Sequence, residues 1–122
     1  MYLLPQEVEV WYIIPAIRKE MSRVLVEKYE LSYEKTGALI GVTKAAVSQY
    51  ISNKRATKMK LPDWAKKEVE KSAEIIVADN KRAIREIQRI LRLMRKKKCS
   101  CSICKKYNTG IEMYCDCNGE CE

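Results

Sequence analysis

The sequence predicts an all-α protein, and its composition supplies the main reasons. Apolar residues make up 47% of the 122 residues, yet Phe is absent and aromatic residues total 7%, so the core must be mainly aliphatic. The chain contains four Gly and three Pro, and no long segment alternates apolar with polar residues as a half-buried strand would. This length suits one ordinary domain, or a small domain with an appendage.

The net charge of +8 is unevenly distributed along the chain. Residues 1–98 hold 22 cations against 12 acids, whereas residues 99–122 hold two Lys against four acids. A basic body attracts polyanions, and nucleic acid is the commonest polyanion inside a cell. The sequence has no run of 18 apolar residues and no signal-peptide pattern at its amino terminus. We therefore expect a cytoplasmic protein without a membrane partner.

Local signals place the helices and their ends. The expected helices, in chain order, span residues 5–14, 15–29, 33–40, 44–52 and 62–98. Pro15 either kinks the first helix or opens the second, because proline suits a first helical turn and disrupts an interior. Ser32 and Thr43 are candidate N-caps, and Gly41 can end a helix in the left-handed conformation. Residues 53–61 form a basic loop.

The long segment 62–98 has two possible structures. Steps of four and three, with one polar interruption at Asn80, connect its apolar positions, which are Val69, Ala73, Ile76, Ala83, Ile87, Ile90 and Met94. One interpretation is a continuous heptad seam that pairs two chains, with Asn80 fixing register. The other is two helices, with Asp79 capping the second at Asn80. The pattern alone does not choose between them.

Residues 33–52 carry the features of two short helices that cross at a tight turn. Such a turn needs a very small residue where the backbones meet, here Gly37, and Gly41 at the turn itself. The expected apolar contacts come from Leu39 or Ile40, Val42, Val47, and Tyr50 or Ile51. An ordinary helical hairpin would satisfy the same pattern. The charge favours a DNA-binding helix-turn-helix, because residues 35–62 contain six cations and no acid.

The same region resembles the lambda-repressor/Cro-like (Xre) helix-turn-helix family, and more closely a group of small archaeal predicted regulators. The resemblance rests on Pro5 with Glu7-Val8, Ile14-Pro15-Ala16-Ile17-Arg18, Leu25-Val26-Glu27-Lys28-Tyr29 and the segment from Gly41 to Arg55. It covers residues 5–55 well and the remainder loosely. Gly37 stands where the family commonly has Ala, which we expect to be a tolerable difference that slightly weakens the helix.

The resemblance implies that the helix at 44–52 enters the major groove of DNA. By matching positions, the side chains that face base edges are Lys44, Ala45, Ser48 and Gln49, and those that approach phosphates are Thr43, Asn53, Lys54 and Arg55. Gln49 can bond an adenine edge in two places, Lys44 can read guanine, and Ala45 can touch a thymine methyl group.

All six cysteines lie in the last 24 residues, and the chain has no His. Clustered thiolates in a cytoplasmic protein favour metal binding over a disulfide framework. The expected ligands are Cys101, Cys104, Cys115 and Cys117, with Cys99 and Cys121 as alternates. We favour an iron–sulfur cluster because six cysteines exceed the four that zinc needs, and zinc is the alternative. A tail of free or redox-active thiols is a further possibility.

The sequence therefore predicts three segments: a helix-turn-helix DNA-binding domain at 1–61, a helical dimerisation or linker segment at 62–98, and a cysteine-rich metal-binding tail at 99–122. The expected function is that of a homodimeric transcription regulator on double-stranded DNA, whose tail senses redox state, iron or oxygen. The alternatives are a structural-zinc adaptor that docks a partner protein, and an antitoxin. No enzyme is expected, because no catalytic constellation or phosphate loop is visible, and no small-molecule substrate is evident.

Overall fold

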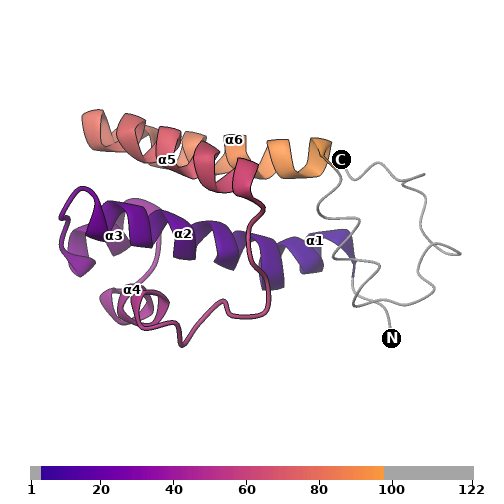
Figure 1. The fold of residues 1–122 in the computed structure, drawn as a ribbon, viewed down its shortest axis with the longest axis horizontal. Coiled ribbons are helices and arrows are strands. Elements are labelled where there is room, and N and C mark those ends of the chain that lie inside the picture. Colours follow the sequence, from indigo (N-terminus) through magenta and orange to yellow (C-terminus); the bar gives the residue numbers. More distant parts are fainter. Residues whose placement is uncertain (1–3, 98–122) are drawn as a thin grey trace, which may run out of the picture.

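A computed structural model of the chain describes residues 4–97, and all regular structure in that range is helical (Figure 1). The predicted all-α class is therefore confirmed for the described residues. The elements are α1 (Pro5–Val8), η1 (Glu9–Ile13), α2 (Ile14–Glu27), α3 (Tyr33–Ile40), α4 (Lys44–Ile51), α5 (Asp63–Ala78), η2 (Asn80–Arg82) and α6 (Ala83–Lys96).

The first three elements follow one another along a single helical rod (Figure 1). The turn before Pro15 is a wide π-turn, in which the Ile14 N–H donates to the carbonyl of Glu9. Proline has no N–H, and its ring crowds the carbonyl four residues earlier in an ordinary α-helix. A wider turn relieves that conflict without breaking the rod. Pro15 thus lies in the first turn of α2, the second of the two predicted arrangements.

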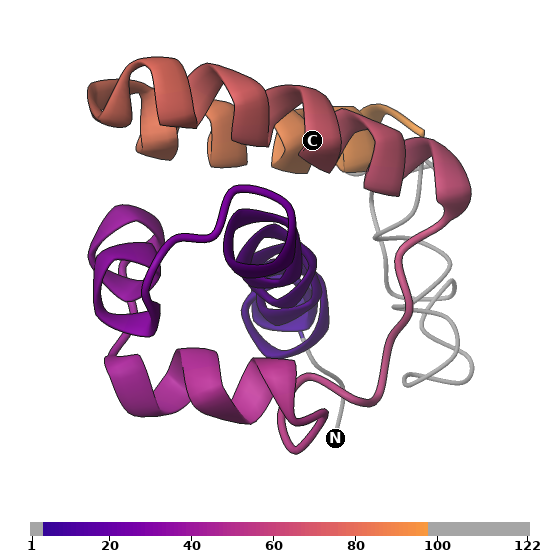
Figure 2. The ribbon, with the colours of Figure 1, turned by 60° about the vertical axis from the view of Figure 1, so that its left-hand side comes forward.

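Segment 62–98 forms two helices. α5 ends at Ala78, and the side chain of Asp79 caps the next turn by accepting a 3.1 Å hydrogen bond from the Lys81 N–H. The chain then reverses, so that α6 lies back alongside α5 (Figures 1 and 2). The two-helix prediction is correct, and Asn80 is exposed at the reversal.

The heptad-seam interpretation needs correction. The α5 positions Val69, Ala73 and Ile76, and the α6 positions Ile90 and Met94, are fully buried within one chain. They belong to one hydrophobic core with α2, so the residues on both sides of the 61/62 boundary pack together. Most of this apolar stripe is therefore buried within the chain, and in the described residues it does not form a continuous exposed seam.

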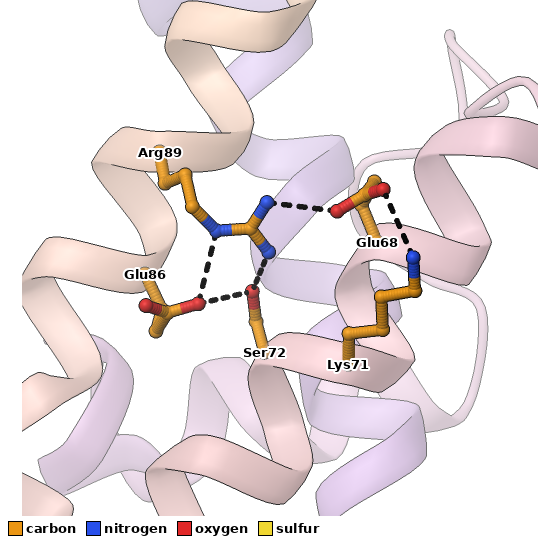
Figure 3. A network of polar contacts seen from close by, with 5 residues as sticks. All are labelled: Glu68, Lys71, Ser72, Glu86 and Arg89. Atoms are coloured by element: carbon orange, nitrogen blue, oxygen red, sulfur yellow. Dashed lines mark hydrogen bonds and ion pairs between the residues drawn. The ribbon is translucent and has the colours of Figure 1, made fainter.

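A polar network also joins α5 to α6 (Figure 3). The Arg89 guanidinium donates through Nη1 to Glu68 Oε2 at 2.8 Å, through Nε to Glu86 Oε1 at 3.1 Å, and through Nη2 to Ser72 Oγ at 2.8 Å. Ser72 in turn donates to Glu86 at 2.8 Å. The hydrogen bond from Arg89 holds the pKa of Glu68 below its ordinary value. The network fixes how the two helices face each other.

Candidate nucleic-acid interface

Both predicted N-caps are present, one at the start of α3 and one at the start of α4. The Ser32 hydroxyl accepts a 3.1 Å hydrogen bond from the Lys35 N–H at the start of α3, and Thr43 accepts one of the same length from the Ala46 N–H at the start of α4. Gly41 ends α3 with a φ of 80°, a conformation that glycine adopts without strain. A turn of three residues therefore separates two capped helices.

Gly37 is the point of closest approach between α3 and the turn. A Cβ at this position would lie 2.6 Å from the carbonyl oxygen of Val42, which is backbone and cannot rotate away. The prediction that this position needs a very small residue is therefore confirmed. Glycine is required because the chain turns back tightly over its own helix.

The two faces of α4 differ sharply. Ala46, Val47 and Tyr50 are buried, as is Ile40 of α3, and Val42 is partly buried against the core. The eight residues predicted to meet DNA are all exposed: Thr43, Lys44, Ala45, Ser48, Gln49, Asn53, Lys54 and Arg55. Helix α4 lies at the edge of the molecule opposite the α5–α6 pair (Figures 1 and 2). The structure thus presents these eight side chains from one helix and the loop that follows it.

The surface around α4 is basic. Lys35, Lys44, Lys54, Arg55 and Lys60 are exposed, and no acid occurs in residues 35–62. Arg23 pairs with Glu20 within α2, Arg89 with Glu68 between α5 and α6, and Arg95 with Glu9 between α6 and η1. Because residues 35–62 contain no acid, the positive charge of that segment is not balanced within it, and it would attract an anionic polymer.

The loop after α4 is held by contacts that the sequence did not predict. Asn53 adopts a left-handed φ of 60° and accepts a hydrogen bond from Lys19 of α2. The Arg55 guanidinium lies 6.0 Å from the centre of the buried Tyr50 ring. Both contacts involve residues predicted to approach phosphates, so they help to position that part of the surface.

Arg18 is a residue near this surface that sequence reasoning did not assign a role. It lies on α2, and its guanidinium comes within 3.8 Å of where a Cβ of Gly41 would be. Its Nε atom is buried and has no hydrogen-bond partner among the described residues. The helical spacing of Trp11, Pro15 and Arg18 does indicate that they share one face of the rod. No local signal shows that this face meets the loop after α4.

The predicted metal ligands, Cys101, Cys104, Cys115 and Cys117, and the alternates Cys99 and Cys121 all lie outside the described residues. Within residues 4–97, no three acidic or cysteine side chains are grouped as a metal site would require. In the same range, none of the helices combines the length and apolarity needed to cross a bilayer.

No protein-family model, curated protein or solved structure matches this chain. The resemblance to the lambda-repressor/Cro-like family therefore stays a prediction from the residues. The features that bear on function are the geometry and charge of the surface around α4.

Proposed function

We propose that this chain is a sequence-specific DNA-binding transcription regulator that places α4 in the major groove of duplex DNA. The observation that carries the proposal is the exposed, acid-free face of α4 and its following loop, set on a buried apolar face. An α-helix fits the major groove, and a helix held only by its inner face leaves its outer side chains available for base edges.

The roles within this surface follow from position and chemistry. Lys44, Ala45, Ser48 and Gln49 lie on the exposed side of α4, where a groove-bound helix meets base edges. Lys54 and Arg55 lie beyond its end, where the DNA backbone passes. Pairing of two chains on adjacent half-sites is part of the proposal, since regulators of this design read sites about one DNA turn apart.

A substitution of Gln49 tests sequence reading directly. Gln49→Ala removes a side chain able to make two bonds to adenine, a contact worth about 1–3 kcal/mol of discrimination against a wrong base. We expect selection from a randomised duplex pool to show lost preference at one position, while binding to bulk DNA is retained. Gln88→Ala is the matched control, because Gln88 is also an exposed helical glutamine but lies on α6. Equal base preference in both variants would contradict the assignment of Gln49.

The proposal also gives the cysteine tail at residues 99–122 a role in sensing redox state, iron or oxygen. Six cysteines within 24 residues are the basis for an iron–sulfur cluster, with structural zinc as the alternative. Anaerobic purification of the full chain should give brown protein with iron and sulfide bound, and Cys101→Ser with Cys104→Ser should remove the colour. Colourless protein with stoichiometric zinc would favour the adaptor function, and protein without metal would contradict both centres.

A further inference from the structure

A groove of about 420 Å³ lies beside the DNA-facing surface. Its lining comes from η1 and the start of α2, from Val42 in the α3–α4 turn, from Tyr50 near the end of α4, and from the loop at residues 54–59. This volume falls within the range of about 300–1,000 Å³ that is usual for small-molecule sites. It is therefore large enough for a ligand.

The charges that line the groove favour an anionic ligand. Arg18, Lys54 and Arg55 line it, and none of its described lining residues is an acid. The guanidinium of Arg18 has five N–H donors, and its Nε, which is buried, has no partner among the described residues. Because Nε is enclosed, the Nη groups are the donors for a ligand in the groove, and a phosphate oxygen is an acceptor whose charge and geometry match a guanidinium.

The aromatic side chains that line the groove favour a ligand with a planar ring. Trp11 lines it and is 62% exposed, so much of its side chain is accessible to a ligand. Tyr50 forms part of the same lining, with the Arg55 guanidinium 6.0 Å from its ring centre. An exposed indole beside cations is a surface on which a base stacks while its phosphate is held.

We propose that this groove is a nucleoside-phosphate site, in which Arg18 binds the phosphate and Trp11 stacks on the base. The site goes beyond the proposed DNA contacts, although Lys54 and Arg55 belong to both surfaces. A bound nucleotide places negative charge beside the two cations that DNA phosphates would use. It therefore acts as an effector that weakens DNA binding.

Calorimetric titration of the full chain tests the site without DNA, so its result does not depend on the proposed function. The probes are adenosine monophosphate, inorganic phosphate and adenosine. We expect saturable binding of adenosine monophosphate at one site per chain, and at least about tenfold weaker binding of each fragment, because each lacks half of the recognised chemistry. Absence of saturable nucleotide binding at millimolar concentration overturns the proposal.

Three variants connect that binding to the groove. Arg18→Met and Trp11→Ala should each weaken adenosine monophosphate binding by about tenfold or more, since one loses charged hydrogen bonds and the other a stacking face. Arg85→Met, which removes an exposed cation from α6, is the control matched in net charge and should bind normally. Trp11→Ala also guards against misfolding, because Trp11 is largely exposed. Unchanged nucleotide binding in both groove variants overturns the assignment.

The phosphate could also come from the DNA backbone, and a duplex-binding arm separates the two sources. If the free nucleotide is the ligand, adenosine monophosphate lowers the duplex affinity of the wild-type chain, and this effect is lost in Trp11→Ala. If Arg18→Met lowers duplex affinity while adenosine monophosphate fails to bind the wild-type chain, the groove holds a DNA phosphate and the nucleotide-site proposal is wrong.

Discussion

At the scale of single residues, Gly37 shows how a backbone contact overrides a local preference. Helix propensity favours alanine over glycine by about 1 kcal/mol, and on that ground an alanine at position 37 would strengthen α3. The structure places the Val42 carbonyl oxygen 2.6 Å from where its Cβ would be. The tight α3–α4 turn must therefore shift before it can accept a side chain at this residue.

We predict that Gly37→Ala lowers the free energy of unfolding by a net value of about 1–2 kcal/mol, because overpacking costs more than the propensity gain returns. Urea denaturation followed by circular dichroism measures the change. Ala38→Ser, at the exposed neighbouring position, should stay within about 0.5 kcal/mol of wild type. A Gly37→Ala protein more stable than wild type would show that the turn is looser than described.

A second residue-scale contact ties the ends of the described chain together. Arg95 on α6 donates to both carboxylate oxygens of Glu9, at 2.7 and 2.8 Å, and Glu9 lies in the π-turn of the rod. The hydrogen bond to Glu9 raises the pKa of Arg95 above its ordinary value. Because Glu9 is only 8% exposed, removal of Arg95 would leave a buried carboxylate without this hydrogen-bond partner, and the pair locks α6 onto the rod.

At the scale of elements, the polar network between α5 and α6 makes stability depend on pH. The carboxylate of Glu68 is stabilised by Arg89 in the folded chain, so its pKa there is lower than in the unfolded chain. A group of this kind contributes its stability above the unfolded pKa and loses it as the pH falls through the folded pKa. The contribution is therefore full at neutral pH and disappears under acid conditions.

We predict that Glu68→Gln lowers the free energy of unfolding by about 1 kcal/mol at neutral pH, the scale of a partly buried charged hydrogen bond. The difference from wild type should shrink as the pH falls below the ordinary glutamate pKa of about 4.3 and then through the lower folded pKa of Glu68. Unfolding curves across this pH range measure it. Glu70→Gln, at an exposed position on the same helix, should show no such trend. If the difference in unfolding free energy between Glu68→Gln and wild type is the same at all pH values, the charge of Glu68 contributes nothing to stability.

The elements also show which parts of the fold the sequence could predict. The bounds of α3 and the start of α4 are predictable because Ser32, Gly41 and Thr43 act on neighbouring backbone groups, and local chemistry sets them. The partner of the apolar stripe on 62–98 is not predictable in the same way. Periodicity shows that a helical face is buried, but it does not distinguish burial against another chain from burial against α2.

For the whole molecule, one candidate surface could be predicted from the sequence and the other could not. The residues predicted to meet DNA lie on one helix and the loop after it, so their exposure could be predicted from the periodicity of residues 43–55. The groove joins Trp11 and Arg18 of the rod to Lys54 and Arg55, far away in the sequence. Their meeting is decided by tertiary packing of the rod against α4, and no pattern in the chain records it.

We expect the basic surface around α4 to bind duplex DNA. That binding depends on where the positive charge lies and not on its total. Cations clustered on one face release counterions from DNA together, so affinity falls steeply as salt rises. Scattered cations of the same net charge would contribute far less to one binding face. Two variants of equal net charge separate these cases, namely Lys54→Gln with Arg55→Gln on the surface, and Lys67→Gln with Arg85→Gln on α5 and α6.

The most direct measurement is the affinity of the wild-type chain for a random-sequence duplex across a salt series. If about six phosphates are neutralised per bound pair of chains, the slope of log affinity against log salt should be about −5. The Lys54→Gln/Arg55→Gln variant should lose about two units of that slope for each bound chain, and the Lys67→Gln/Arg85→Gln variant should keep it. A flat salt response of the wild-type chain, or equal slopes for the two variants, would contradict the account.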